Sequence, residues 1–306
     1  MLVPKKVKIV EVGPRDGLQN ESGTVTVDLR IDLINRLTRA GLPAIEAGSF
    51  VSPQWVPQMA NTAKVLENII PGKGVNYPVL VPNLRGFNDA LTAGAKEVAI
   101  FASASELFSQ RNINCSVAES LDRFAAVCSA AKVNGIRIRS YISCCLGCPY
   151  EGDVPLNSVV KLAVRLLAMG CNEISLGDTI GIGTPNRAEA LVDAVLAVVP
   201  RERVAVHFHD TYGQGLVNTL AALQRGIAIV DTSVGGLGGC PFAEGATGNI
   251  ATEDVLFMLN GLGVSTGVNL EKVVDTAHVI FAALGRKPVS RVARVTASYG
   301  MRIQEK

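Results

Sequence analysis

Long apolar runs and concentrated positive charge are both missing from this 306-residue sequence. No uninterrupted apolar stretch reaches the roughly 18 residues that a membrane-spanning helix requires. Charged residues make up 18% of the chain, the formal net charge is +2, and the basic residues are scattered rather than interleaved with aromatics. We therefore expect neither a membrane protein nor a nucleic-acid-binding protein.

Cysteine is also sparse, with seven residues, an odd number that suits reduced thiols better than a disulfide framework. Cys144, Cys145 and Cys148 lie close together, but no second Cys-x-x-Cys accompanies them, so we expect buried packing there rather than a zinc or redox site. The first residues show neither a secretory signal nor an Arg/Ser-rich presequence. We expect a cytoplasmic protein from which no N-terminal segment is removed.

What the chain does contain is a hydrophobic fraction of 48%, arranged in short β-branched runs that alternate with amphipathic stretches. Eight runs read as strands. They are 7–12, 44–47, 75–81, 97–101, 136–143, 173–176, 204–207 and 228–232. Helical patterns of period 3.6 are clear at 27–40, 117–134, 155–169, 185–199, 216–225 and 270–284, and another begins near 252.

This alternation predicts an α/β fold, a (β/α)8 TIM barrel with a C-terminal helical extension. We place the barrel at about 5–262 and the extension at about 263–306, in a single catalytic domain whose polar tail from Gly285 wraps the outside or frays. An open doubly wound sheet is the alternative. It would need a glycine-rich turn after the first strand, where this chain instead has the charged Arg15-Asp16.

Polar residues follow five of the predicted strands. They are Arg15-Asp16, Glu46 with Ser49, Asp178-Thr179, His207-Phe208-His209-Asp210, and the loop Gly235–Cys240. Barrel enzymes carry their catalytic groups at this end of the strands. We therefore expect these side chains to share one face.

His207 and His209 are two of only three histidines, and their i, i+2 spacing directs both imidazoles to the same side of a strand. With a carboxylate such as Asp16 they would form a metal site with open positions. Taken alone, the pair is better explained as hydrogen-bonded strand-end histidines. The acidic residues on other strand ends favour the metal site.

Cys240 lies among the glycines at 235, 236, 238, 239, 245 and 248. A loop of this composition can close on a ligand and bring an acid/base cysteine with it. The same pattern fits a surface loop with an incidental cysteine, and the spacing does not separate the two. No phosphate-binding fingerprint is matched.

Several motifs resemble the 3-hydroxy-3-methylglutaryl-CoA lyase family. These are Gly13-Pro-Arg-Asp-Gly-Leu-Gln-Asn-Glu21, Glu46-Ala-Gly-Ser-Phe-Val-Ser-Pro53, His207-Phe-His-Asp210, and Gly236-Leu-Gly-Gly-Cys-Pro241 through Gly248-Asn-Ile-Ala-Thr-Glu-Asp254. They occur in order from about residue 5 to about residue 290.

The resemblance implies a divalent cation, Mg²⁺ or Mn²⁺, bound by Asp16, His207, His209 and Asn249. It implies an acyl-CoA substrate contacted by Arg15, Gln19, Ser49 and Asp178. It also implies catalytic roles for Arg15, Asp16, Glu46, His207 and Cys240, and a homodimer. The C-terminal segment from Ser290 to Tyr299 lacks the cysteine through which some members are regulated, so we do not expect that regulation.

The expected reaction is retro-Claisen cleavage of 3-hydroxy-3-methylglutaryl-CoA to acetyl-CoA and acetoacetate, as in leucine degradation. Cys240 would take the hydroxyl proton, Arg15 would bind the enolate oxygen, and Glu46 would orient Arg15. Three alternatives stay open at this point. They are a lyase for a longer-branched substrate, a condensing enzyme of the isopropylmalate or homocitrate synthase type, and a catalytically silent metal- or acyl-CoA-binding barrel.

Overall fold

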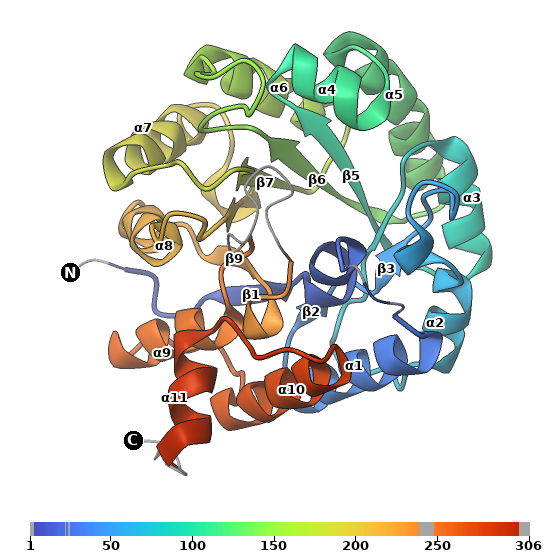
Figure 1. Cartoon of the computed structure of the whole chain (residues 1–306). Coiled ribbons are helices and arrows are strands. Elements are labelled where there is room, and N and C mark those ends of the chain that lie inside the picture. Colours follow the sequence, from blue (N-terminus) through green and yellow to red (C-terminus); the bar gives the residue numbers. More distant parts are fainter. Residues whose placement is uncertain (1–2, 22, 24, 239–247, 300–306) are drawn as a thin grey trace.

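The computed structural model describes residues 3–21, 23, 25–238 and 248–299. A ring of parallel strands forms its centre (Figure 1). The strands are β1 (Lys8–Glu11), β2 (Ala44–Ile45), β3 (Gly48–Ser49), β4 (Val79–Leu80), β5 (Glu97–Ser103), β6 (Arg137–Ser143), β7 (Glu173–Asp178), β8 (Val204–Phe208) and β9 (Ile229–Thr232).

The sheet closes into a barrel because β2 and β3 are two parts of one extended segment. β2 pairs with β1, and β3 pairs with β4 after a break at Glu46 and Ala47. The hydrogen-bonded order β2-β1-β9-β8-β7-β6-β5-β4-β3 therefore starts and ends on the same segment. Across the break, the backbone N–H groups of Glu46 and Ala47 still donate to neighbouring strands on either side. The expected α/β TIM barrel is confirmed.

Helices surround the strands (Figure 1). They are α1 (Val27–Arg39), α2 (Thr62–Asn68), α3 (Leu84–Thr92), α4 (Glu106–Ile113), α5 (Val117–Val133), α6 (Leu156–Ala168), α7 (Pro185–Leu196), α8 (Gly215–Gln224), α9 (Thr252–Gly261), α10 (Leu270–Ala283) and α11 (Arg291–Tyr299). Their apolar faces pack on the outward side chains of the strands, which gives one large core cluster between the two layers. In the described part of the chain, no helix is both long and apolar enough to cross a membrane.

Two expectations about local structure differ from what the structure shows. The run 75–81 forms a regular strand only at Val79–Leu80, because Pro78 has no N–H to donate to a ladder. Residues 291–299, part of the tail expected to wrap or fray, form helix α11. Ser290 begins this helix, accepting a hydrogen bond from the backbone of Ala293, and α11 packs on α9 and α10.

The inward side chains change character along the barrel axis. One small cluster is apolar and comprises Val10, Val12, Ala44, Ala205 and Ile229. Because strand side chains alternate, the inward residue two positions after Ala205 is His207, and two positions after Ile229 it is Asp231. The inward positions of β8 and β9 therefore change from apolar to polar towards the carboxyl ends of these strands.

Candidate metal centre and active site

Arg15 and Asp16 lie in a tight turn, η1 (Gly13–Gly17), directly after β1. Three successive N–H groups, those of Arg15, Asp16 and Gly17, converge on the carbonyl of Val12 at 2.8–3.3 Å. The turn is anchored to the end of β9 by the buried Glu11, whose carboxylate accepts hydrogen bonds from the N–H groups of Gly13 and Val234. This arrangement presents both charged side chains to the barrel mouth.

Glu46 holds Arg15 from the neighbouring segment. The Glu46 carboxylate is fully buried, and its Oε2 accepts hydrogen bonds from Arg15 Nε at 2.7 Å and from the Tyr141 hydroxyl at 3.1 Å. The Arg15 guanidinium also donates to Asp16 at 2.5 Å and lies over the Tyr141 ring. Burial raises the pKa of Glu46, although the Arg15 charge opposes this shift. Arg15 is thus fixed on three sides.

Gly48 allows the strand segment to approach helix α1 at this point. Its φ is +155°, and an added Cβ would lie 2.5 Å from Arg30 Nη2 and 2.6 Å from Thr62 Oγ1. Arg30 itself is 1% exposed and donates to Thr62 and to the carbonyl of Ala60. A side chain at position 48 would therefore displace the segment that carries Glu46.

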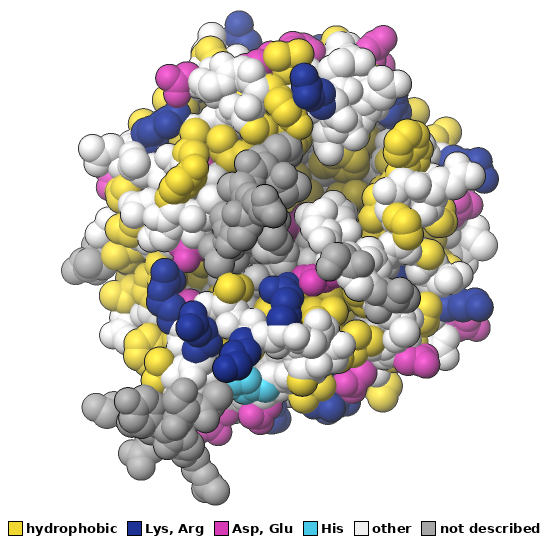
Figure 2. All heavy atoms as spheres, viewed as in Figure 1, with side chains coloured by type: hydrophobic (Ala, Val, Ile, Leu, Met, Phe, Trp, Pro, Cys, Tyr) yellow, Lys and Arg dark blue, Asp and Glu magenta, His cyan; other side chains and the backbone are white. Residues whose placement is uncertain are grey.

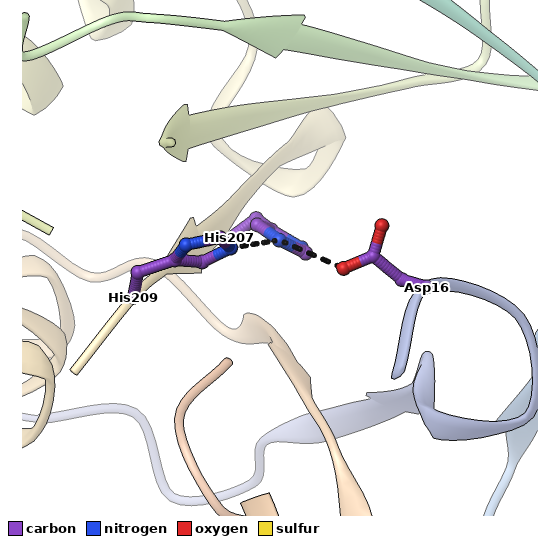
Figure 3. A group of neighbouring side chains, drawn as sticks. All are labelled: Asp16, His207 and His209. Carbon is purple, nitrogen blue, oxygen red and sulfur yellow. Dashed lines mark hydrogen bonds and ion pairs between the residues drawn. The ribbon is translucent and has the colours of Figure 1, made fainter. Parts of the chain in front are cut away.

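His207, His209 and Asp16 converge as the sequence spacing predicted (Figure 3). Their candidate ligand atoms all lie within 4.8 Å of one another. The two Nε2 atoms are 3.3 Å apart, and His207 Nε2 is 3.9 Å from Asp16 Oδ2. Two donors bound to one ion at about 2.1 Å lie roughly 3.0–3.4 Å apart, so the group fits a divalent cation after a small adjustment at Asp16.

The charge states of these groups suit a cation site. Burial, together with the neighbouring His207, lowers the pKa of His209 to about 4, which keeps its imidazole neutral and able to donate a lone pair. Burial opposes ionisation of Asp16, but the Arg15 guanidinium outweighs it, and the pKa of Asp16 falls to about 2. Near neutral pH the site therefore offers the neutral imidazole of His209 and the carboxylate of Asp16.

Asn249 lies beside Asp16. Its amide nitrogen donates to Asp16 Oδ2 at 2.8 Å and to the carbonyl of Leu237 at 3.3 Å. As a cation ligand Asn249 would have to use its Oδ1 atom instead. Its assignment as a fourth ligand stays a prediction.

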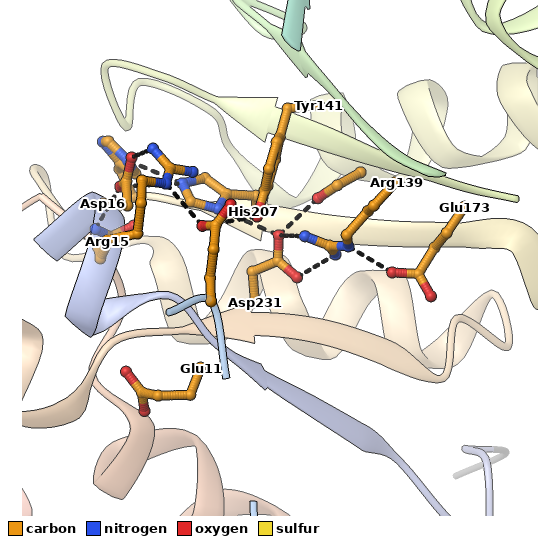
Figure 4. A network of polar contacts seen from close by, with 12 residues as sticks. Glu11, Arg15, Asp16, Arg139, Tyr141, Glu173, His207 and Asp231 are labelled. Atoms are coloured by element: carbon orange, nitrogen blue, oxygen red, sulfur yellow. Dashed lines mark hydrogen bonds and ion pairs between the residues drawn. The ribbon is translucent and has the colours of Figure 1, made fainter. Parts of the chain in front are cut away.

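A layer of buried charged residues lies behind His207, deeper in the barrel (Figure 4). Asp231 Oδ2 is 3.3 Å from His207 Nδ1 and accepts a hydrogen bond from Ser175 at 2.8 Å. Arg139 donates to both oxygens of Asp231 and to Glu173. Burial opposes the charge on Asp231, but Arg139 holds the pKa of this carboxyl well below its usual range.

The remaining expected site residues do not belong to the Asp16, His207 and His209 group. Ser49 and Asp178 are buried at the ends of β3 and β7, and Gln19 is half-buried just after η1. The Asp178 carboxylate accepts the N–H of Gly183 at 2.9 Å, and burial raises its pKa to about 6. Cys240 lies outside the described residues. Roles in substrate binding and catalysis for these four residues stay predictions.

A cavity of about 180 Å³ opens next to Asn249. Asp210, Ser290, Arg291 and Arg294 also line it, and Arg291 forms an ion pair with Asp210 at 3.2 Å. Figure 2 shows basic side chains gathered on this face of the molecule. The start of α11 therefore adds positive charge beside the candidate metal centre.

Comparison with known proteins places this site in a family, because the HMGL-like family model matches residues 6–280. The chain belongs to the HMGL-like family. The matched range includes every strand of the barrel and the candidate cation ligands, whereas Ser290 and α11 lie beyond it.

Within this family, the chain is 58% identical over 294 residues to the mitochondrial hydroxymethylglutaryl-CoA lyase of Rattus norvegicus, covering 96% of this chain and 90% of the relative. It is 57% identical to the 3-hydroxy-3-isohexenylglutaryl-CoA/hydroxy-methylglutaryl-CoA lyase of Pseudomonas aeruginosa, covering 96% and 98%. The crystal structure of a hydroxymethylglutaryl-CoA lyase from Pseudomonas aeruginosa superposes with a TM-score of 0.96 at 56% identity, covering 97% and 99%.

Sequence reasoning missed the layer formed by Arg139, Glu173, Ser175 and Asp231, and it missed Tyr141. The signal was available, because charged residues are rarely fully buried unless paired, and these positions fall inside predicted strands. Which charges pair could not be predicted, since Arg139 and Asp231 are 92 residues apart and meet only when the barrel closes.

Proposed function

We propose that this protein cleaves 3-hydroxy-3-methylglutaryl-CoA to acetyl-CoA and acetoacetate with the help of a divalent cation. One observation carries the proposal. In a chain 58% identical to a hydroxymethylglutaryl-CoA lyase, Asp16, His207 and His209 converge directly beside the fixed Arg15. The geometry combines a cation site with a permanent positive charge, as cleavage to an enolate requires.

Asp16, His207 and His209 would hold the cation, with Asn249 as the fourth candidate. Mg²⁺ or Mn²⁺ is the proposed ion, although this ligand set also suits other divalent metals. When bound, such an ion acts as a Lewis acid that stabilises negative charge on a substrate oxygen.

Arg15 is proposed to bind the thioester oxygen on which the enolate charge develops. Its guanidinium cannot lose its proton, because Glu46 and Asp16 raise its pKa further although burial opposes the charge. Glu46 orients the guanidinium by its hydrogen bond to Nε, and the Tyr141 ring lies beneath it. Because the Arg15 guanidinium is already in position before the reaction, the site needs no reorganisation when negative charge develops on the thioester oxygen.

Two proton transfers complete the proposed reaction. Cys240 takes the proton of the tertiary hydroxyl, a role that rests on the sequence motif alone. The proton that Cys240 takes must then reach the enolate carbon, and Asp16 or His207, which lie 3.9 Å apart at the candidate cation site, is the proposed relay for it. Both carboxylate and imidazole are suited to such a transfer.

The acyl-CoA character of the substrate is supported by two arginines in the cavity beside Asn249, which Asp210 and Asp254 also line. Arg291 and Arg294 line it beside Asn249, where they would attract the phosphates of a coenzyme A group. A related hydroxymethylglutaryl-CoA lyase structure, 35% identical with a TM-score of 0.92, is described as a complex with coenzyme A and 3-methylmalate.

A longer-branched substrate is the second candidate, because the Pseudomonas aeruginosa relative is named as a lyase for an isohexenylglutaryl thioester as well. A condensing reaction has less support, since the relatives with 56–58% identity are named as lyases. The homodimer, the cytoplasmic location and the role in leucine degradation remain predictions.

The deciding experiment supplies the purified chain with Mg²⁺ and 3-hydroxy-3-methylglutaryl-CoA and measures acetyl-CoA and acetoacetate. We expect both products in equal amounts. A parallel reaction with the isohexenyl analogue compares kcat/KM for the two substrates, and a third reaction with acetyl-CoA and a 2-oxo acid measures free coenzyme A. Free coenzyme A in the third reaction, without cleavage in the first, would overturn the proposal.

A further inference from the structure

The barrel interior contains a carboxylate that the proposed reaction leaves unused. Asp231, on β9, is 2% exposed, and its Oδ2 lies 3.3 Å from His207 Nδ1. The other nitrogen of the same ring, Nε2, faces His209 and Asp16 at 3.3 and 3.9 Å. One imidazole therefore contacts the candidate ligands through one nitrogen and Asp231 through the other (Figure 4).

We propose that Asp231 is a positioning residue that accepts the Nδ1–H of His207 and thereby presents the Nε2 lone pair to a divalent cation. In a neutral imidazole one nitrogen carries the hydrogen and the other accepts. An acceptor fixed at Nδ1 selects the tautomer whose Nε2 is free to bind a metal, and it also fixes the plane of the ring. The inference rests on the cation site of the proposed function.

The carboxylate of Asp231 is itself firmly held. Arg139 donates to both of its oxygens, and Ser175 donates to Oδ2, the oxygen that faces His207. Arg139 is held in turn by Glu173 at 2.5 Å, and Glu173 accepts from Lys8 at 3.0 Å. A carboxylate that is hydrogen-bonded at both oxygens cannot rotate away from the imidazole. The residues on the strands therefore fix the Asp231 carboxylate, and Asp231 in turn fixes the His207 ring.

Stability alone is a weak reason for these charges. A buried ion pair costs several kcal/mol of desolvation per ion, and well-packed apolar residues in its place often leave a protein equally stable. Arg139, Glu173 and Asp231 are each at most 4% exposed, and a small apolar cluster shares the barrel interior with them. The chain of contacts that these residues form ends at the imidazole of His207, a candidate ligand, and this arrangement fits a positioning role.

The first test compares Asp231→Asn with Glu173→Gln. Both variants remove a carboxylate from the same arginine, but only Asp231 contacts His207. Mn²⁺ is titrated into the chelator-treated full-length chains by calorimetry. We expect Asp231→Asn to bind Mn²⁺ about 10- to 100-fold more weakly than the wild type, and Glu173→Gln to bind as the wild type does. Equal affinity in Asp231→Asn and the wild type would overturn the inference, and so would equal losses in both variants.

A second measurement needs no substitution and applies if Asp231→Asn fails to fold. The ¹⁵N spectrum of the histidine rings in the metal-free wild type reports which nitrogen of His207 is protonated. We expect the hydrogen on Nδ1, and a hydrogen on Nε2 alone contradicts the positioning role. If the wild type binds no divalent cation, the proposed function loses its metal centre, whereas the tautomer result still reports separately on the Asp231–His207 contact.

Discussion

Glu46 Oε2 lies 2.7 Å from Arg15 Nε and joins the second strand segment of the barrel to the turn after the first. The same oxygen accepts the hydroxyl of Tyr141. Arg15→Lys keeps the positive charge but loses the planar fork that contacts Glu46 and Asp16 at once. We expect kcat to fall about 100- to 1,000-fold, the usual effect of losing an oxyanion donor, while KM changes far less.

Steady-state kinetics measure this effect, and Arg36→Lys is the matched control. Arg36 lies on α1 and pairs with Asp32 on the partly exposed helix surface, away from the barrel mouth. If Arg15→Lys retained the wild-type kcat, Arg15 would not be the donor to the enolate oxygen.

Removal of the cation should abolish turnover. We expect a chelator to stop the reaction and added Mg²⁺ or Mn²⁺ to restore it. Asp16→Asn and His209→Ala each remove a candidate ligand, so their Mn²⁺ affinity should fall by more than the roughly 10- to 100-fold expected for a residue that only supports a ligand. Calorimetric titration measures the affinity, with His278→Gln on α10 as the control. Full activity in the presence of chelator would remove the cation from the mechanism.

The role of Cys240 can be separated from cation binding. Cys240→Ala should lower kcat about 10²- to 10⁴-fold, the range for a lost acid/base group, and leave Mn²⁺ affinity nearly intact. Cys115→Ala, which also removes a single thiol, provides the control. Unchanged turnover in Cys240→Ala would show that another group takes the hydroxyl proton.

The carboxyl of Glu11 should make stability depend on pH. Burial raises its pKa from 4.5 to about 7, against the hydrogen bonds from Thr252, Val234 and Gly13. Because the folded state holds this proton more tightly than the unfolded state, the free energy of unfolding should decrease as pH rises from about 4.5 to 7, by about 3 kcal/mol at most from this group.

Glu11→Gln cannot ionise and should lack this contribution. Denaturant titrations at several pH values measure the difference, with the exposed Glu67→Gln on α2 as the control. Parallel pH profiles for Glu11→Gln and the wild type would show that folding leaves the pKa of Glu11 unchanged.

The arginines of the cavity beside Asn249 predict an effect on substrate binding. Arg294→Gln should raise KM for the acyl-CoA substrate up to about fivefold, as expected for one partly exposed charge, and the effect should shrink at high salt. Arg165→Gln on α6 removes an exposed arginine outside this cavity and should leave KM unchanged. A salt-independent KM in the wild type would argue against recognition of phosphates there.

The barrel and much of the site were predictable because their signals are local. Period-2 and period-3.6 patterns define strands and helices, and parallel strands bring their carboxyl ends to one face. Asp16, His207 and His209 could therefore be placed together from their positions after strands, and the structure brings their ligand atoms within 4.8 Å. The break at Glu46-Ala47 was not predictable, because it depends on which neighbouring strand each backbone group meets.

The sequence by itself determined the element order, the residues at the strand ends and the family to which they point. Only the tertiary structure decided that Asp231, 24 residues after His207, contacts Nδ1 of the His207 imidazole. It also decided that Arg139 and Ser175 hydrogen-bond to Asp231 and hold it in place. The physical reason is that alternation along a strand predicts which side chains face inward, whereas the partners of a buried charge come from strands far apart in the chain. Those partners are determined by the closure and stagger of the barrel.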